Sequence, residues 1–364
     1  MKKNKNVIHI IADLGNGGAE RQLVELLKAN PHHKLVVLKN TGIYKKDLDK
    51  LKIDYKELNV KSTLEVLFNF HRISKIIKSS KSVIVHAWMY NACALVSLLK
   101  FLFNIRLKVV WGIRCSNMEV KHYSWNLKLV INLCKIISFA ADYIVYNSYA
   151  GLKYHNSIGF SNKFNKVIYN GIDEKKFYFS NVKRNKLKKN LGIENDSIVI
   201  VCVGRVDPMK NHYNLLKAYE KVRKQNKNTR LLLIGKGTEN FKEQEGVIAL
   251  GMKVHIEDYY SVGDIIILPS KFGEGFSNVL AEGMLCKLFP IATKVGDSQN
   301  IISNVGLTCG GFSSLEIAKS LEIAFNFTKR EVINFKERAR KRIILEFNIR
   351  KMSLSYNYIY NEIT

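Results

Sequence analysis

Short apolar segments alternate with segments of helical periodicity through the first half of the chain. The apolar segments are rich in β-branched residues and comprise Val7–Leu14, Lys34–Leu38, Val83–His86, Val109–Gly112 and Tyr143–Asn147. Most are separated by stretches such as Ala19–Asn30, in which apolar residues recur at helical spacing. Short, continuously apolar strands joined by helices are typical of a parallel sheet covered on both faces. The pattern therefore predicts a Rossmann-like α/β domain over residues 1–170.

The same alternation restarts near residue 198. The strands predicted there are Ile198–Val203, Leu231–Ile234, Val247–Leu250, Asp264–Leu268 and Phe289–Thr293, and glycine or a Pro-Ser pair follows most of them. A second series of strand–helix units predicts a second Rossmann-like domain over residues 176–347. The join lies within Tyr169–Lys189, where Asn170 and Gly171 favour a turn.

The chain ends in three helix-forming segments, Ser313–Phe327, Arg330–Phe347 and Arg350–Ile363. The last, about 348–364, carries Tyr356, Tyr358 and Tyr360, and we expect it to cross back and pack on the N-terminal domain. Spacing alone equally allows it to cap the second domain. The expected fold class is α/β, with two Rossmann-like domains facing a central cleft.

Composition narrows the class of protein. A chain of 364 residues with 47% hydrophobic and 24% charged residues suits two globular domains. The six cysteines lie far apart, without a CxxC pair or a histidine at ligand spacing, which favours reduced thiols in a cytosolic protein over disulfides or a zinc site. The basic start lacks a long apolar run and is interpreted as a first strand, not a signal peptide.

The formal charge is +27, and it is distributed unevenly. Residues 1–170 hold 27 Lys and Arg against 10 Asp and Glu, whereas residues 171–364 hold 31 against 21. Nucleic acid, anionic lipid or a diphosphate ligand could each favour such a surface. Charge alone does not choose among them.

Two apolar stretches approach the length of a membrane span, but lysines interrupt both of them. These are Asn91–Ile105 and Trp125–Val145. In the second, a stripe at helical spacing comprises Leu129, Val130, Leu133, Ile136, Ile137 and Ala140, with the lysines off the stripe. We favour a core helix of the α/β domain. A helix lying on a membrane surface is the alternative.

Glycine-rich turns follow two of the predicted strands. Gly15-Asn16-Gly17-Gly18-Ala19-Glu20 opens a helix, so its backbone N–H groups could face an anion. Glu20 stands where a dinucleotide fingerprint needs its third glycine, which argues against an NAD site. The second turn is Gly235-Lys236-Gly237.

The segment from Val203 to His212 places Arg205 and Lys210 between a strand and a helix. Two cations at the carboxyl end of a strand could close on a pair of phosphates, because open α/β sheets bind ligands at that edge. In so basic a chain, two solvated surface cations are the simpler interpretation of the residues alone.

The segment Lys271–Met284, KFGEGFSNVLAEGM, carries the strongest signal. We expect a helix that begins near Phe276 or Ser277, so that Glu274 and Glu282 differ by roughly 80° around its axis. Glu282 lies in an apolar stretch, where a buried acid needs a partner. The alternative makes Glu274 an ordinary first-turn acid and Glu282 a surface residue.

The segments GNGGAERQL, VGRVDPMKNH, YNGID and LPSKFGEGFSNVLAEGM resemble, in this order, those of glycosyltransferase family 4. The resemblance implies the GT-B fold and a retaining, hexosyltransferase-type enzyme that uses nucleotide sugars. It implies that Arg205 and Lys210 bind the diphosphate, and that Glu274 binds the transferred sugar. The donor would also contact Gly17, Gly18, Gly235, Gly275, Phe276, Ser277, Asn278 and Glu282.

The chain departs from that family near the reacting sugar. Many members have a histidine after the strand that matches Val109–Gly112, and Arg114 occupies that place here. A guanidinium cannot act as a base, so Arg114 would instead hold a phosphate or acceptor oxygen. His86, after another strand, is a second acceptor-side candidate; a core or rim histidine is equally compatible with its position.

The expected reaction moves a sugar from a nucleotide-diphosphate sugar, UDP favoured over GDP, to a hydroxyl of a glycan or lipid-diphosphate-linked acceptor. It would serve bacterial polysaccharide, lipopolysaccharide or glycoprotein glycan assembly, in the cytoplasm or at the inner membrane's cytosolic face. No metal or other cofactor is expected, and Asp47-Leu48-Asp49 is interpreted as a solvated helix face. The alternatives are a sugar-nucleotide 2-epimerase-like isomerase and a non-catalytic relative; a nucleic-acid partner is disfavoured.

Overall fold

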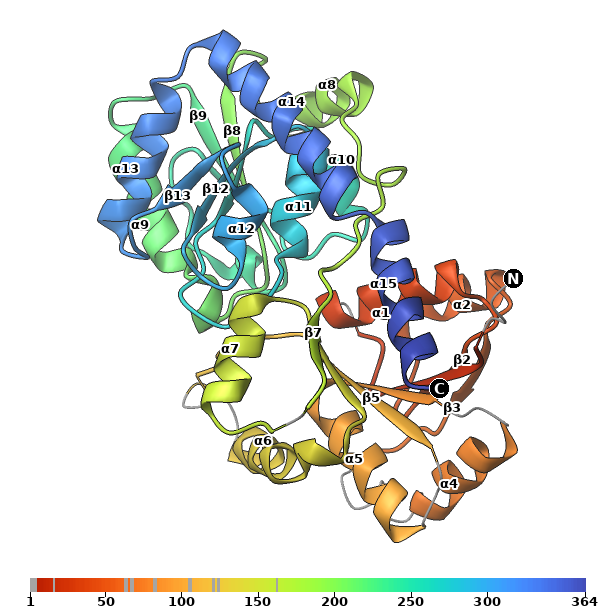
Figure 1. Cartoon of the computed structure of the whole chain (residues 1–364). Helices are drawn as coiled ribbons and strands as arrows, with labels where there is room; N and C mark the ends of the chain where they lie inside the picture. Colours follow the sequence, from red (N-terminus) through yellow and green to blue (C-terminus); the bar gives the residue numbers. More distant parts are fainter. Residues whose placement is uncertain are drawn as a thin grey trace. The chain divides into compact units, whose positions relative to one another are not determined.

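The computed structural model describes residues 5–15, 17–61, 65, 69–80, 84–103, 107–119, 122, 125–161 and 163–364. Val83, Asn16 and Ile105, which belong to segments singled out above, lie outside the described residues. The chain divides into two compact units, one of Met1–Gly171 with Ile349–Thr364 and one of Ile172–Asn348 (Figure 1). The second unit thus begins at Ile172, four residues earlier than the predicted donor domain.

The first unit is built on a parallel sheet of seven strands in the order β3-β2-β1-β4-β5-β6-β7. Its strands are β1 (Val7–Ile11), β2 (Lys34–Val37), β3 (Asp54–Glu57), β4 (Ile84–Trp88), β5 (Lys108–Ile113), β6 (Tyr143–Tyr146) and β7 (Asn165–Val167). The sequence pattern missed β3 and β7, the two edge strands. Both lack fully buried residues, so neither has the apolar run that marks the central strands.

Helices cover both faces of this sheet. They are α1 (Gly18–Ala29), α2 (Lys45–Lys50), α4 (Phe70–Ser79), α5 (Met89–Leu102), α6 (Trp125–Ile137), α7 (Tyr149–Ser157) and α15 (Ile349–Glu362), with 3-10 turns η1 (Gly42–Tyr44) and η3 (Ser138–Ala140). One apolar cluster joins α1, α2 and α15 to the sheet, and another joins α4, α5 and α6 to it. None of the helices among the described residues is long and apolar enough to cross a membrane.

The last helix, α15, packs in the first unit, as one of the two interpretations of the sequence predicted. Its buried residues include Met352, Tyr356, Ile359 and Tyr360, which share an apolar cluster with α1. Asn30, at the end of α1, donates a hydrogen bond to Ser353 Oγ at 3.0 Å. These contacts make the end of the chain part of the first unit's core.

The predicted core stripe of α6 is wrong in two positions. Leu129 and Ile136 are 53% and 68% exposed, whereas Ile131, Cys134 and Ile137 are buried. The segment is apolar on more than one side, so hydrophobic periodicity alone is compatible with either of two apolar stripes facing the core. Packing of α6 on α5 selects the one that contains Cys134.

The second unit repeats the design with a six-stranded parallel sheet, β10-β9-β8-β11-β12-β13. Its strands are β8 (Ile198–Val203), β9 (Thr229–Ile234), β10 (Val247–Ala249), β11 (Ile265–Leu268), β12 (Phe289–Thr293) and β13 (Leu307–Cys309). Its helices are α8 (Asn181–Asn190), α9 (His212–Arg223), α10 (Ile256–Tyr260), α11 (Asn278–Leu285), α12 (Ser298–Ile302), α13 (Ser314–Phe325) and α14 (Lys329–Glu346), with η4 (Pro208–Lys210) and η5 (Thr238–Asn240).

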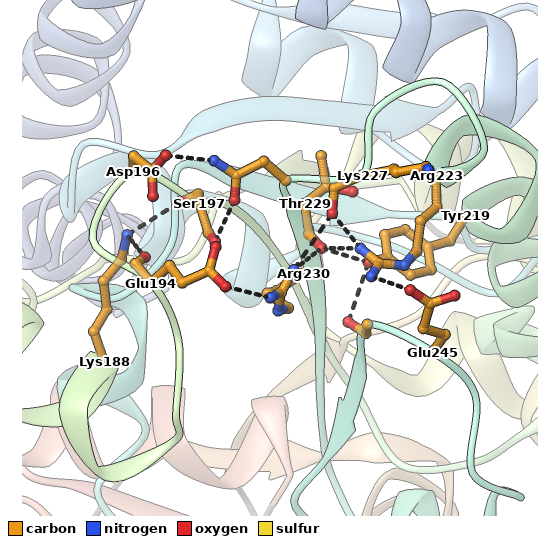
Figure 2. Close-up of polar contacts among 12 residues, drawn as sticks. Lys188, Glu194, Asp196, Ser197, Tyr219, Arg223, Lys227, Thr229, Arg230 and Glu245 are labelled. Atoms are coloured by element: carbon orange, nitrogen blue, oxygen red, sulfur yellow. Dashed lines mark hydrogen bonds and ion pairs between the residues drawn. The ribbon is translucent and has the colours of Figure 1, made fainter.

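Polar contacts brace the end of this sheet where β8 and β9 begin (Figure 2). Arg223 donates to the carbonyls of Lys227 and Thr229 and pairs with Glu245 at 2.7 Å. Lys188 is buried and donates to three backbone carbonyls of the segment 194–197. These bonds satisfy buried backbone acceptors. They lie at the amino ends of the strands. A ligand is expected at the opposite end of the sheet, because open α/β sheets bind ligands at the carboxyl ends of their strands.

Candidate active site

The candidate residues of the second unit lie where the strand order reverses. From β8 the chain proceeds outward to β9 and β10, then returns to place β11 on the other side of β8. The loop after β8 carries Arg205 and Lys210, and the loop after β11 carries Glu274. Ligands of open α/β sheets bind outside the carboxyl ends of the strands at this kind of switch point.

Local backbone structure positions Lys210. Asp207 caps the short helix η4 by accepting a hydrogen bond from Met209 N at 2.9 Å, and Pro208 begins that helix. Asn211 follows in the left-handed region at φ 58°, and its amide donates to the carbonyls of Pro269 and Phe312, both at 2.8 Å. Asn211 thereby ties the loop after β8 to the loop after β11.

Lys210 and Ser270 both bind the same oxygen of Glu274. Lys210 Nζ lies 2.6 Å from Glu274 Oε1, and Ser270 Oγ donates to that oxygen at 2.7 Å. Glu274 is only 7% exposed, so the ion pair is largely removed from water. Among the described residues none donates to Oε2, which is therefore the oxygen available to a ligand hydroxyl.

Glycines allow this loop to fold tightly. Gly273 has φ 79°, and a Cβ at Gly296 (φ 60°) would lie 2.1 Å from the carbonyl oxygen of Glu274. A Cβ at Gly235, φ 149°, would likewise lie 2.1 Å from the carbonyl oxygen of Gly204, beside Arg205. No L side chain fits at such approaches. Glycine at positions 235 and 296 therefore allows the backbone to pass this close to the carbonyl oxygens of Gly204 and Glu274.

Glu282 is buried and bonded to a tyrosine. It is 1% exposed, and Tyr260 OH donates to its Oε2 at 2.9 Å. This excludes the surface position for Glu282. The expected helix start, Phe276 or Ser277, is one or two residues early: Ser277 is the N-cap, its hydroxyl accepting from Leu280 N, and α11 begins at Asn278. Glu274 precedes the helix, as the expected start near Phe276 or Ser277 also implied.

The other candidate residues of the second unit differ in their exposure to solvent. Arg205 has a 58% exposed side chain, and its guanidinium bonds Asp207 Oδ2 at 2.9 and 3.1 Å. Gly275 accepts from Asp297 N at 3.1 Å. Phe276 is buried against Phe347, with ring centroids 5.2 Å apart. Arg205 is thus the exposed cation, whereas Phe276 is part of the packing beneath the loop.

In the first unit, Gly17 and Gly18 begin α1 at the carboxyl end of β1. Gly17 is the N-cap, and a Cβ there would lie 2.2 Å from Glu20 Oε2. The carboxylate of Glu20, the third residue of the helix, therefore folds back over the turn, as in a capping arrangement. The loop follows β1 at the strand-order reversal between β1 and β4.

His86 and Arg114 lie within the core contacts of α15. His86 is fully buried and its Nδ1 lies 2.8 Å from Tyr360 OH. Arg114 is buried, donates to Tyr356 OH at 2.8 Å and to Asn170 Oδ1, and lies over the Trp88 ring at 5.3 Å. Of the two positions considered for His86, the core is the one observed. His86 lies in the middle of β4 and Arg114 directly follows β5, and both side chains bond to tyrosines of α15.

Sequence reasoning did not single out Ser270, Tyr260 or His212. Ser270 lies two residues after the apolar strand β11, which is a detectable signal, but nothing local links Tyr260 to Glu282. His212 is buried beside Lys210, and burial, followed by that positive charge, lowers its pKa to about 4.

Within the part of the chain that the structure describes, no cluster of three metal-ligating side chains occurs. Asp47 and Asp49 lie exposed on α2.

Comparison with known proteins is consistent with this geometry. Residues 197–322, which include Arg205, Lys210, Glu274 and Glu282, match the model of the family described as glycosyl transferases group 1. A Campylobacter jejuni enzyme named N-acetylgalactosamine-N,N'-diacetylbacillosaminyl-diphospho-undecaprenol 4-alpha-N-acetylgalactosaminyltransferase is 25% identical over 306 residues, 78% of this chain and 79% of its own. The capsular polysaccharide biosynthesis glycosyltransferase CapM of Staphylococcus aureus is 26% identical over 83% of this chain and 81% of its own.

Solved structures share the whole architecture. Anabaena HepE, crystallised with UDP and glucose, superposes with a TM-score of 0.85 at 19% identity, covering 98% of this chain and 100% of that one. At this identity the likeness establishes the fold alone. Together with the family match in the second unit and the named relatives, it identifies the chain as a glycosyltransferase with the GT-B fold.

Proposed function

We propose that the protein is a retaining glycosyltransferase that moves a sugar from a nucleotide-diphosphate sugar to a hydroxyl of a glycan or lipid-linked acceptor. The observation that carries the proposal is the Lys210–Glu274 pair, bonded at 2.6 Å and held by Ser270 where the strand order reverses. A cation and an oriented carboxylate, both largely buried, suit a ligand that combines phosphates with sugar hydroxyls.

In this proposal the second unit binds the donor. Arg205 and Lys210 contact the diphosphate, and Glu274 Oε2 accepts hydrogen bonds from the transferred sugar. The N–H groups at the start of α11, around Gly275–Asn278, face the same ligand. Glu282, oriented by Tyr260, accepts the ribose hydroxyls.

The proposed reaction is a front-face displacement. The acceptor oxygen bonds to the anomeric carbon as the bond to the diphosphate breaks on the same face. The electron pair stays on the departing phosphate oxygen, which takes the acceptor's proton. Lys210 and Arg205 stabilise the charge that grows on the leaving group, the kind of contribution that is usually the largest in such sites. The scheme needs no protein base and no metal.

The acceptor is proposed to bind the first unit. The name of the Campylobacter relative describes an acceptor carried on diphospho-undecaprenol, and that of the Staphylococcus relative describes capsular polysaccharide biosynthesis. The first 170 residues of this chain are poor in acids, which suits a diphosphate-linked acceptor. We therefore assign the protein to bacterial cell-surface glycan assembly, with a UDP-sugar as the donor favoured over a GDP-sugar.

The deciding experiment compares UDP, GDP and their sugar conjugates in a thermal-shift screen, followed by turnover with the stabilising donor. We expect one nucleotide family to raise the melting temperature. The proton NMR coupling of the new anomeric centre then reports retention. Incubation of the nucleotide sugar without acceptor is the control, because an epimerase releases free product there. The proposal fails if no nucleotide stabilises the protein.

A further inference from the structure

The solvent-facing side of α6 has an unusual composition. Trp125, Leu129 and Ile136 are 70%, 53% and 68% exposed, and Phe139, in the 3-10 turn that continues the helix, is 65% exposed. At 3.6 residues per turn these four positions fall within about 80° of arc, opposite the buried residue Cys134. The exposed side of the helix is therefore largely apolar, with Asn132 as the one exposed polar residue within this arc.

The stripe continues onto the end of α5. Phe101 and Leu102, the last residues of α5, are both more than half exposed. The rings of Phe101 and Phe139 lie with their centroids 6.2 Å apart, which joins the two helices across one surface. We call these six residues, Phe101, Leu102, Trp125, Leu129, Ile136 and Phe139, the α5–α6 face.

Cations accompany this face and acids do not. Lys128 and Lys135 are exposed on α6 itself, and no residue of that helix is acidic. Asp142, the acid that follows it in the chain, is already neutralised by Lys100 at 3.0 Å and Lys108 at 3.2 Å.

A basic hollow adjoins the end of α5. It measures about 450 Å³ and is lined by His71, Ser74, Lys75, Lys78, Ser79 and Phe103, the last of which directly follows Leu102. Its two lysines are exposed on α4. Cations therefore border the α5–α6 face at the end of α5 as well as on α6.

From this composition we infer that the α5–α6 face docks on an anionic phospholipid bilayer. Bulky apolar side chains insert at the headgroup boundary, while lysines on long stems reach the lipid phosphates. Protein interfaces are depleted in lysine, so lysines along one side of the apolar stripe favour lipid over a second copy of the chain or another protein. The inference rests on the proposed function, because docking would bring the first unit to a lipid-linked acceptor.

The chain carries its own reporter for this docking. Of its three tryptophans, Trp88 and Trp111 are fully buried, and Trp125 lies on the α5–α6 face. Mixing the full-length protein with phosphatidylcholine vesicles containing phosphatidylglycerol should shift the tryptophan emission to the blue, and brominated lipid should quench it. Trp125→Phe should lose both signals yet still float with the vesicles. Vesicles of phosphatidylcholine alone should bind much more weakly, because they lack the anionic headgroups.

Two matched double variants separate docking from a general loss of apolar surface. Leu129→Asn with Ile136→Asn should lower flotation with anionic vesicles about tenfold. Val254→Asn with Ile333→Asn, which changes two exposed residues of the second unit, should leave it unchanged. Lys128→Gln with Lys135→Gln should weaken binding and reduce its dependence on salt.

Each outcome bears on one claim. Equal flotation of the two asparagine variants, or no flotation of the wild type at low salt, overturns the docking inference. A change of oligomeric state in the Leu129 and Ile136 variant, seen by light scattering without vesicles, assigns the face to self-association and also overturns it. The nucleotide thermal shift is measured on the same samples. Its loss in the wild type would contradict the proposed function, whereas its retention in every variant shows that the donor site is intact.

Discussion

Lys210 Nζ and Glu274 Oε1 lie 2.6 Å apart, although the two residues are 64 positions apart in the chain. Each side chain neutralises the other in a place where neither is well solvated. Removing either partner of such a pair leaves the other as an uncompensated charge. The two substitutions should still differ in effect, because Lys210 is proposed to bind the diphosphate and Glu274 the transferred sugar. A diphosphate that approaches Lys210 would share its charge and leave the carboxylate oriented by Ser270.

Substitutions at the pair should separate sugar transfer from nucleotide binding. Glu274→Gln should lower kcat by about 100-fold or more while changing the Kd of the free nucleotide by no more than about threefold, because the proposed partner of the carboxylate is the sugar. Lys210→Ala should lower kcat and weaken nucleotide binding together. Calorimetry and nucleotide-release kinetics measure the two effects. Lys271→Ala, which removes an exposed lysine of the same loop, is the control and should retain both properties.

Ser270 should act through Glu274. Ser270→Ala removes the 2.7 Å bond to Oε1 and should lower kcat about tenfold, with a smaller change in KM, since the carboxylate loses its fixed orientation. In a Glu274→Gln background the same substitution should add little, because coupled residues give non-additive effects. Losses that multiply in the double variant would show that Ser270 acts independently of Glu274.

Tyr260 should affect the nucleotide more than the transfer step. Tyr260→Phe deletes the 2.9 Å bond to Glu282 Oε2 and leaves a buried carboxylate with one fewer donor, at a cost of about 1–3 kcal/mol. The proposed ribose contact would weaken, raising the nucleotide Kd about tenfold with kcat nearly unchanged. Tyr259→Phe, at the neighbouring and more exposed position, controls for loss of a hydroxyl. An unchanged Kd in Tyr260→Phe would separate Glu282 from the ribose.

Arg114 should matter for the stability of the first unit. Its guanidinium is buried and bonded to Tyr356 on α15 and to Asn170. Arg114→Met should lower the free energy of unfolding by about 2–4 kcal/mol, because Asn170 and Tyr356 lose a charged donor. Tyr356→Phe keeps the ring and should cost about 1 kcal/mol. Chemical denaturation measures both. A folded Arg114→Met protein with wild-type stability and lost turnover would instead place Arg114 at the acceptor.

The sequence predicted most of the fold because its central strands are mostly apolar, as in Ile198–Val203 and Phe289–Thr293. It missed Asp54–Glu57, a charged edge strand, for the reason that no apolar run marks it. In the candidate site, residue type and spacing singled out Glu274 and Glu282, whereas the ligand role expected of Lys210 came from the resemblance to glycosyltransferase family 4. Tyr260 was not found, because only the tertiary fold brings it to Glu282. The stripe on α6 was misassigned because two apolar stripes share that helix and only α5 decides which is buried.

Buried histidines should make the protein sensitive to mild acid. Burial lowers the pKa of His33 to about 3 and that of His155 to about 4, and it lowers the pKa of His9 well below its usual value. His9 accepts from Trp88 Nε1 at 3.1 Å through Nδ1, so its Nε2–H donates to His33 Nδ1 at 3.0 Å. Protonation of His9 would place a hydrogen on Nδ1 as well as on Nε2, so Nδ1 could no longer accept from Trp88.

The sign of this pH effect follows from the lowered pKa values. Below the unfolded value of about 6.5 the unfolded chain binds protons that the folded chain does not, so stability falls as pH falls. Each such histidine contributes about 1.4 kcal/mol per pH unit, until its folded pKa is reached. The lowered pKa of Asp142 and of Asp264 adds a loss only in stronger acid, below about pH 4. Denaturant unfolding between pH 7.5 and 5 should therefore show decreasing stability below pH 6.5, and His155→Gln should reduce that slope. A flat profile over this range would show that the histidines titrate alike in the folded and unfolded chains.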